Sequence, residues 1–325
     1  MKILVVGGAG YIGSHQVKLL IENDYDVVVL DNLSTGHEHA IDPKALFIKG
    51  DLRDKELVEK ILVEHKIEAI FHFAALSIVS DSMKQPLAYF NNNVYAMQVL
   101  LEAMVKCQVT KLIMSSTAAT YGIQEEMPIM EDATTIPVNP YGESKLMMEQ
   151  LLKWTSLTSN LNYVILRYFN VAGASLDGSI GEEHNPETHL IPIVIETALE
   201  KRSHLEIFGD DYSTPDGTCI RDYVHVVDLV QAHLLALDYL NKGNESTIFN
   251  IGYGHGYSVK EIIDVVRKVT NKEFEVKVEK RRFGDPDVLI ASNQKITDVL
   301  KWQPQYDDIK IIVESAYNFH KKKRE

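Results

Sequence analysis

The sequence predicts an α/β fold in which helices cover both faces of a parallel sheet. Short apolar runs rich in β-branched residues recur through the first half of the chain, each followed by a turn signal or a helical pattern. Strands that are buried on both faces are nearly continuous apolar runs of this kind. The chain has 325 residues, about twice the roughly 150 typical of one domain, so a second and smaller mixed α/β region is expected.

The expected strands of the first half are 3–6, 27–30, 46–48, 69–73 and 111–114, and the first expected helix is 12–21. After Asn170 the chain becomes polar and contains Gly and Pro over 173–187, which indicates a crossing into the second region. In that region the periodicity predicts helices at 190–201, 226–240, 259–269 and 309–320, and strands at 205–208 and 247–251.

The composition argues against several classes of protein. With 45% hydrophobic and 24% charged residues the chain is neither disordered nor a disulfide-stapled miniprotein. A net charge of −13 disfavours binding to nucleic-acid backbones and anionic membranes. Cys107 and Cys219 match no metal-site or disulfide spacing, and the apolar opening run is too short for a signal peptide or a spanning helix. A cytoplasmic protein is expected.

A glycine-rich turn follows the first expected strand. Its sequence, Gly7-Gly8-Ala9-Gly10-Tyr11-Ile12-Gly13, leads directly into the expected helix. Glycines permit a tight turn and let the backbone approach a pyrophosphate, which the exposed N–H groups of the helix start attract. Asp31 ends the next apolar run, where a carboxylate binds the adenosine ribose and repels a 2′-phosphate. Together these residues predict a Rossmann domain that binds NAD rather than NADP.

Tyr141 and Lys145 stand four residues apart at the start of an expected helix, after Asn139-Pro140. This spacing places both on one helical face. There the ammonium stabilises the phenolate and lowers the pKa of the phenol, which makes Tyr141 a candidate base at neutral pH. Thr117 follows the expected strand 111–114 and can place a hydroxyl at the carboxyl edge of the sheet, beside the nicotinamide.

In this order, the glycine turn, Asp31, Thr117 and the Tyr141–Lys145 pair resemble the extended short-chain dehydrogenase/reductase family over nearly the whole chain. The chain is most similar to the UDP-sugar 4-epimerases of that family, through segments 10–15, 31–33, 92–94, 139–145, 167–170, 216–218, 221–226 and 281–285. The resemblance implies NAD-dependent inversion of carbon 4 of UDP-glucose or UDP-galactose through a transient 4-keto sugar. It also implies an NAD-binding domain of residues 1–170 and about 219–245, and a UDP-sugar-binding domain of about 171–218 and 246–325.

The resemblance also assigns roles to single residues. Tyr141 would be the acid/base, Lys145 its electrostatic partner and a ligand of the nicotinamide ribose, and Thr117 the hydroxyl that bonds the sugar O4. Further contacts to NAD are expected from Asn32, Asp51, Leu52, Phe73, Ala74, Ala75, Asn93 and Tyr168. Contacts to the UDP-hexose are expected from Asn170, Leu190, Phe208, Arg221, Tyr223, Arg282, Asp285 and Leu289.

Two residues depart from the family pattern. Ser77 stands where members often carry a Lys that contacts the cofactor, and His189 where Asn is common. No metal is expected, since the acidic and histidine residues of the polar stretch, Asp177, Glu182, Glu183 and His184, are irregularly spaced and lack a second cluster. The resemblance further implies a homodimer formed through helices near 87–106 and 142–156.

Several alternatives stay open at this point. A nucleotide-sugar 4,6-dehydratase needs carboxylates where this chain has Ala118-Ala119. A UDP-glucuronate decarboxylase or epimerase shares the same cofactor half and is harder to exclude. A non-catalytic NAD-sensing module is disfavoured by the intact catalytic set. Activity on UDP-N-acetylhexosamines depends on Leu289, where family members carry either a bulky Tyr or a smaller residue.

Overall fold

The computed structural model describes residues 1–282 and 284–323. Phe283, which belongs to the motif 281–285, lies outside the described residues. The chain divides into two compact units. Unit 1 contains Met1–Gly122, Asp132–Tyr168 and Val230–Phe249, and unit 2 contains Ile123–Glu131, Phe169–Leu229 and the described residues from Asn250 onward. Among the described helices, none combines the length and the apolar character that crossing a membrane requires.

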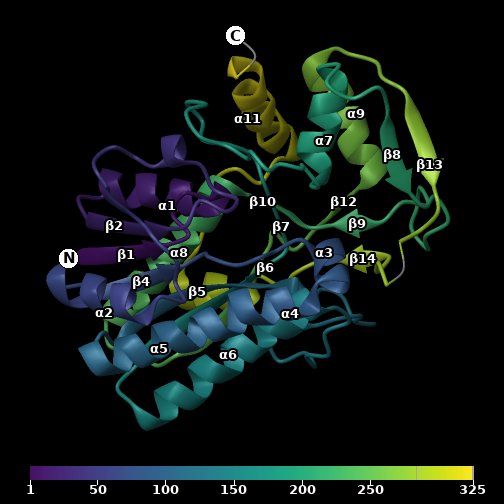
Figure 1. Cartoon of the computed structure of the whole chain (residues 1–325). Coiled ribbons are helices and arrows are strands. Elements are labelled where there is room, and N and C mark those ends of the chain that lie inside the picture. Colours follow the sequence, from purple (N-terminus) through teal and green to yellow (C-terminus); the bar gives the residue numbers. More distant parts are fainter. Residues whose placement is uncertain (283, 324–325) are drawn as a thin grey trace. The chain divides into compact units, whose positions relative to one another are not determined.

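Unit 1 is built around a sheet with the strand order β11-β6-β5-β4-β1-β2-β3 (Figure 1). From β6 to β3 every neighbouring pair is parallel. The strands are β1 (Lys2–Val6), β2 (Asp26–Asp31), β3 (Leu46–Lys49), β4 (Ala69–His72), β5 (Lys111–Thr117), β6 (Asn162–Tyr168) and β11 (Thr247–Ile251). Strands β1, β2 and β3 follow one another toward one edge of the sheet, and β4, β5 and β6 toward the other, so the strand order reverses beside β1. This is the order of a doubly wound Rossmann fold, and the expected fold is confirmed.

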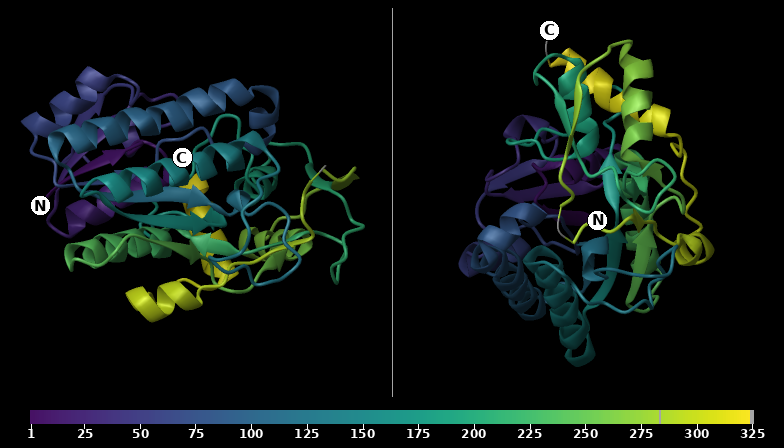
Figure 2. Two further views of the ribbon diagram at one scale, coloured as in Figure 1. Left: turned by 90° about the horizontal axis from the view of Figure 1, so that it is seen from below. Right: turned by 90° about the vertical axis from the view of Figure 1, so that its right-hand side faces the viewer.

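Helices cover both faces of this sheet. The larger ones are α1 (Tyr11–Glu22), α2 (Lys55–Glu64), α5 (Ala96–Cys107), α6 (Pro140–Thr158) and α8 (Val226–Asn241). Leu4, Val28 and Ile70 point from one face into a core completed by α2, α5 and α6. Figure 2 shows the sheet with helices on both of its faces. On the face opposite to this core, the ring of Phe71 lies 6.4 Å from that of His233 of α8.

Shorter helical segments connect these elements at the carboxyl end of the sheet. They are η1 (Glu38–Ala40), α3 (Val79–Lys84), α4 (Pro86–Tyr89), the π-helical η2 (Phe90–Tyr95) and η3 (Ala118–Thr120). A π-helical turn inside a helical run often marks a functional site. Here η2 lies between α4 and α5 and holds Asn93.

Unit 2 contains short strands and a layer of helices. Its strand pairs are β7 (Asn170–Ala172) with β10 (Tyr223–His225), β8 (Leu205–Phe208) with β13 (Val276–Glu279), and β9 (Ile220–Arg221) with both β12 (Tyr257–Ser258) and β14 (Val288–Leu289). The helices are α7 (Leu190–Ala198), α9 (Val259–Thr270), α10 (Gln294–Leu300) and α11 (Ile309–Lys322). Three of them, α7, α9 and α11, pack on one another. The helices expected in this part of the chain are confirmed.

Candidate active site

The glycine-rich turn joins β1 to α1 in a conformation that fits a pyrophosphate. Gly7 has a φ of +80°, and a Cβ there would lie 2.6 Å from the backbone nitrogen of Ala74. A Cβ at Gly13 would collide with the carbonyl oxygen of Gly7. Gly10 is the N-cap of α1, and a Cβ there would lie 3.5 Å from the carbonyl oxygen of Gly7, in ordinary van der Waals contact. The helix has no side-chain cap and no acidic residue in its first turn. The exposed N–H groups of that helix start therefore face no competing anion within α1.

Asp31 ends β2 beside this turn. One oxygen of its carboxylate accepts a hydrogen bond from Ala9 N at 3.0 Å, and the other accepts from Leu33 N at 2.8 Å. The two bonds fix the carboxylate against the glycine turn and leave further lone pairs for ribose hydroxyls. The donor and acceptor groups of this part of unit 1 therefore fit NAD.

Asn32 and Asp51 meet at the ends of β2 and β3, where the amide of Asn32 donates to Asp51 Oδ2 at 3.1 Å. Arg53, a residue that we did not expect here, binds both oxygens of Asp51 at 2.8 and 2.7 Å. The hydrogen bonds from Arg53 hold the pKa of Asp51 well below its usual range. Leu52 between them is buried.

The loop after β4 is held by Asn93. Phe73 N and Ala74 N both donate to Val6 O, at 2.8 and 3.1 Å, and Ala75 continues the loop half-buried. The buried amide of Asn93 accepts from Leu76 N at 2.9 Å and donates to Leu76 O and to the hydroxyl of Ser144 in α6. The structure thus shows Asn93 joining this loop to α6, while Ser77 at the loop's tip is exposed.

Thr117, Tyr141 and Lys145 come together at the carboxyl end of β5. Asn139 caps α6 by accepting a hydrogen bond from Gly142 N at 2.9 Å, so Tyr141 lies in the first turn. Its phenol hydrogen-bonds the Thr117 hydroxyl. The Nζ of Lys145 is buried and donates to the carbonyl oxygen of Ser115 at 2.9 Å.

Burial dominates the protonation of this group of side chains. It raises the pKa of Tyr141 to about 12, although the hydrogen bond from Thr117 acts in the opposite direction. Burial also lowers the pKa of Lys145 to about 8 and, with help from the Lys145 charge, that of His72 to about 3. The expected lowering of the Tyr141 pKa is therefore wrong for the chain by itself, because desolvation of the phenolate outweighs the hydrogen bond from Thr117.

A buried ion pair next to Lys145 escaped sequence reasoning. The carboxylate of Glu149, one turn further along α6, binds Arg167 through Nε at 3.0 Å and Nη2 at 2.5 Å. It also accepts from the Ser116 hydroxyl at 2.5 Å. The i, i+4 spacing of Lys145 and Glu149 was the available signal. The neighbouring Tyr168 is buried and hydrogen-bonds Ser115.

In unit 2 five of the expected substrate residues form two groups. Arg221 Nη2 donates to Asp285 Oδ1 at 2.5 Å, and Arg221 lies opposite Leu289 in the β9–β14 pair. The Arg282 guanidinium lies 4.0 Å from the centre of the Phe208 ring. Within residues 1–282 and 284–323, no carboxylate forms an ion pair with Arg282.

The other three expected substrate residues lie on separate elements of unit 2. Asn170 in β7 is paired with the buried Tyr223 in β10, and Asn170 N donates to Asp222 O at 3.1 Å. Leu190 is the first residue of α7 and follows His189, the N-cap of that helix. Nothing in the geometry contradicts their expected roles, which remain predictions.

Comparison with known proteins gives a consistent picture. The model of the NAD dependent epimerase/dehydratase family matches residues 3–252. The UDP-glucose 4-epimerase of Lacticaseibacillus casei is 55% identical over 320 residues, which cover 98% of this chain and 97% of that protein. Among solved structures, UDP-glucose 4-epimerase from Brucella ovis in complex with NAD has a TM-score of 0.95 at 42% identity, covering 97% of both chains. The UDP-Glc/GlcNAc 4-epimerase of Campylobacter jejuni has a TM-score of 0.87 at 47% identity, covering 99% of both.

Proposed function

This chain belongs to the NAD dependent epimerase/dehydratase family, and from that membership we propose that it is an isomerase that inverts carbon 4 of UDP-hexoses, interconverting UDP-glucose and UDP-galactose. The observation that carries the proposal is the meeting of Thr117, Tyr141 and Lys145 at the carboxyl end of β5, in a sheet whose first turn fits NAD. Relatives that match the chain over nearly its whole length are named for this activity.

The side chains of unit 1 supply the proton transfer. Tyr141 takes the proton of the sugar O4 and returns it after inversion, while the Thr117 hydroxyl holds O4 in place. The glycine turn and Asp31 would hold NAD, which would supply the reversible hydride acceptor that inversion at carbon 4 requires. The ammonium of Lys145, anchored on Ser115 O, stabilises the phenolate and donates to the nicotinamide ribose. Acid–base catalysis of this kind contributes about 10² to 10⁴ in rate.

The UDP moiety is held by unit 2 in this proposal. Arginines offer paired N–H donors to phosphate, and Arg282, free of a carboxylate among the described residues, is best placed to supply them. Arg221 is oriented by Asp285. Tyr223, Asn170, Leu190 and Phe208 complete the expected contacts. Because the protein holds the substrate by its UDP moiety, the hexose is free to turn either face of carbon 4 toward the nicotinamide. The binding energy therefore comes from contacts that are remote from the reacting carbon.

The test is to incubate purified protein with UDP-galactose and no added NAD, and to identify the product sugar. UDP-glucose is expected, because the cofactor is regenerated in every turnover and stays bound. Tyr141→Phe should keep NAD and the fold but lose about 100-fold or more in turnover. Loss of water or of carbon dioxide from a nucleotide sugar, with no epimerisation, would instead identify one of the rival reductases.

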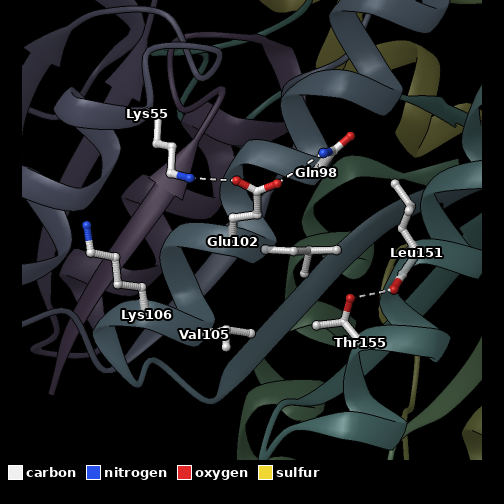
Figure 3. Close-up of a pocket in the computed structure, with 8 residues that line it drawn as sticks. Lys55, Gln98, Glu102, Val105, Lys106, Leu151 and Thr155 are labelled. Carbon is white, nitrogen blue, oxygen red and sulfur yellow. Dashed lines mark hydrogen bonds and ion pairs between the residues drawn. The ribbon is translucent and has the colours of Figure 1, made fainter.

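We also propose that two copies of the chain associate through α5 and α6. Large apolar side chains on these helices and on η2 are exposed, namely Tyr95, Val105, Met147, Trp154 and Leu157. A pocket between the two helices, bordered by α2, is lined by Leu101, Val105 and Leu151 and edged by the Lys55–Glu102 ion pair (Figure 3). An exposed apolar surface with a polar rim is typical of a protein–protein interface. We propose that the same face of a second copy packs against it.

We place the protein in the cytoplasm, where Cys107 and Cys219 remain reduced. Both cysteines are free thiols in the structure. Burial raises the pKa of each thiol, so neither has the character of a reactive thiolate. Their chemistry is therefore that of small half-buried side chains, as expected in a reducing compartment.

A further inference from the structure

Two histidines and two glutamates converge in unit 2, in the segment that precedes α7. Glu182, His184, Glu187 and His189 each place one possible ligand atom so that all four atoms lie within 4.8 Å of one another. The side chains of Glu182 and Glu187 are almost completely buried, at 4% and 3% exposure, whereas those of the two histidines are partly exposed. None of the four is among the residues to which we assign NAD or UDP, and His189 directly precedes Leu190, an expected contact of the UDP-hexose.

The distances within the cluster are those of a coordination shell. His189 Nδ1 is 2.7 Å from Glu182 Oε1 and 3.3 Å from Glu187 Oε1. His184 Nδ1 is 3.1 Å from Glu182 Oε1 and 3.8 Å from Glu187 Oε2. In a tetrahedral zinc site with bonds of about 2.1 Å, neighbouring ligand atoms are about 3.4 Å apart. Both distances from His189 lie below this value, and the two from His184 lie on either side of it.

We propose that Glu182, His184, Glu187 and His189 bind a divalent transition metal ion, with Zn²⁺ as the best match. Imidazole together with carboxylate suits Zn²⁺ better than Mg²⁺ or Ca²⁺, which take oxygen ligands at higher coordination numbers. Two neutral imidazoles and two carboxylates carry a charge of −2, which one divalent ion neutralises. Four protein ligands fill a tetrahedral shell, so the ion is structural and not catalytic.

Backbone and side-chain donors already orient the proposed ligands. Glu187 Oε1 accepts hydrogen bonds from Thr188 N at 2.7 Å and His189 N at 2.8 Å. Arg202 donates to the carbonyl oxygen of Glu187 at 3.3 Å and to Glu196 of α7 at 2.8 Å. Such outer contacts are typical of metal sites, where they fix the orientation of the ligands. Because His189 caps α7, the ion would tie the polar segment to the start of that helix.

Of the four residues named from the sequence as a possible metal loop, Glu182 and His184 belong to the cluster. Glu183 instead forms an ion pair with Lys323. His189 and Glu187 supply the second pair of ligands that the sequence seemed to lack. This segment between β7 and α7 has neither helical nor strand periodicity, so spacing alone does not show which of its side chains meet.

The rival explanation is an ion-pair network without metal. Burial acts to lower the pKa of both histidines, but Glu182 and Glu187 outweigh it and raise the pKa to about 9 for His184 and about 10 for His189. Other titratable or charged groups around the cluster are His320, whose pKa is lowered by burial, Lys323 after α11, and Glu196, Lys201 and Arg202 at or after the end of α7. Protonation of both histidines would neutralise the two carboxylates, and so would one divalent ion bound by neutral histidines. Only a measurement of metal binding therefore distinguishes the two explanations.

The experiment uses the full-length protein without a histidine tag and with its NAD bound. It is dialysed against a chelator and then titrated with Zn²⁺ by calorimetry, and with Co²⁺ to record the visible absorption of a tetrahedral complex. We expect one ion per chain, an absorption band from bound Co²⁺ and a rise in Tm with Zn²⁺, since an ion that binds the folded state stabilises it.

His184→Gln and His189→Gln should each weaken Zn²⁺ binding by more than the roughly 10- to 100-fold known for the loss of an outer-shell partner. The matched control is His204→Gln, since among the described residues His204 forms an ion pair with a single carboxylate, that of Glu206, at 3.6 Å. It should bind Zn²⁺ as the unmodified protein does. Failure of the unmodified protein to bind Zn²⁺ overturns the proposal whatever the variants do, and so does undiminished binding by both cluster variants.

Discussion

At Tyr141 two opposing effects set the pKa of the phenol. Burial raises it to about 12 and the Thr117 hydrogen bond lowers it. A base with so high a pKa is mostly protonated at neutral pH, so catalysis needs positive charge near the phenol. The chain supplies the Lys145 ammonium, whose own pKa is lowered to about 8 by burial. Its charge is therefore present below about pH 8 and is lost above.

Lys145→Met tests this electrostatic role. A base acts when deprotonated, so kcat/KM rises with pH through its pKa, and loss of a nearby cation raises that pKa by about 1 to 3 units. The acidic limb of the profile should move to higher pH by that amount. Above about pH 8 the unmodified enzyme also loses the Lys145 charge, so the two profiles should converge there. If the ratio of kcat/KM between the variant and the unmodified enzyme is the same at every pH, Lys145 only positions other groups.

The family resemblance predicts that Leu289 sets which hexoses the site admits. It is half-buried in β14 opposite Arg221, and its carbonyl oxygen accepts from Asp222 N at 3.1 Å. Leu289→Tyr should reduce kcat/KM for UDP-N-acetylglucosamine far more than for UDP-glucose, because the ring fills the space of the acetamido group. Val288→Tyr is the control, since adjacent strand residues point to opposite faces. Equal effects of both variants on the ratio would remove Leu289 from the hexose site.

At the scale of elements, α6 positions the catalytic group because it is fastened at two levels. Its first turn is capped by Asn139, and Gly142 lets it approach the carbonyl oxygen of Ala119 in η3 more closely than a side chain would allow. Two turns later Glu149 binds Arg167 of β6. Tyr141, Lys145 and Glu149 follow at four-residue intervals along one face, so the ion pair fixes the rotation of the whole helix.

Glu149→Gln should destabilise the protein by about 3 to 5 kcal/mol, because it leaves the Arg167 charge buried without its partner. Denaturant unfolding of the protein with bound NAD measures the effect. The control is Glu314→Gln, which breaks the exposed ion pair with Lys310 on α11 and should change stability little. Equal losses in the two variants would mean that Glu149 acts through its shape and not through its charge.

How far the sequence predicts each element depends on periodicity and length. The strands β1 to β5 were predictable, because buried parallel strands are continuous apolar runs. The strands of two or three residues in unit 2, such as β9 and β14, are too short to show a pattern. Spacing also predicted that Tyr141 and Lys145 are neighbours, but not how deeply they are buried, and burial decides both of their pKa values. Partners distant in sequence, such as Glu149 with Arg167, are fixed only by the fold.

At the scale of the whole molecule, a net charge of −13 keeps separate copies apart, so a dimer needs an apolar surface that outweighs this repulsion. The outer side of α5 and α6 offers Trp154, 68% exposed, and Val105, 48% exposed. Trp154→Glu introduces a negative charge into this face. In an isologous interface both copies carry the substitution, so two negative charges would be buried together. We expect a dimer in sedimentation equilibrium for the unmodified protein and a monomer for the variant. Val278→Glu, which alters a 52% exposed valine on β13 of unit 2, should remain dimeric, and a monomeric unmodified protein would contradict the proposal.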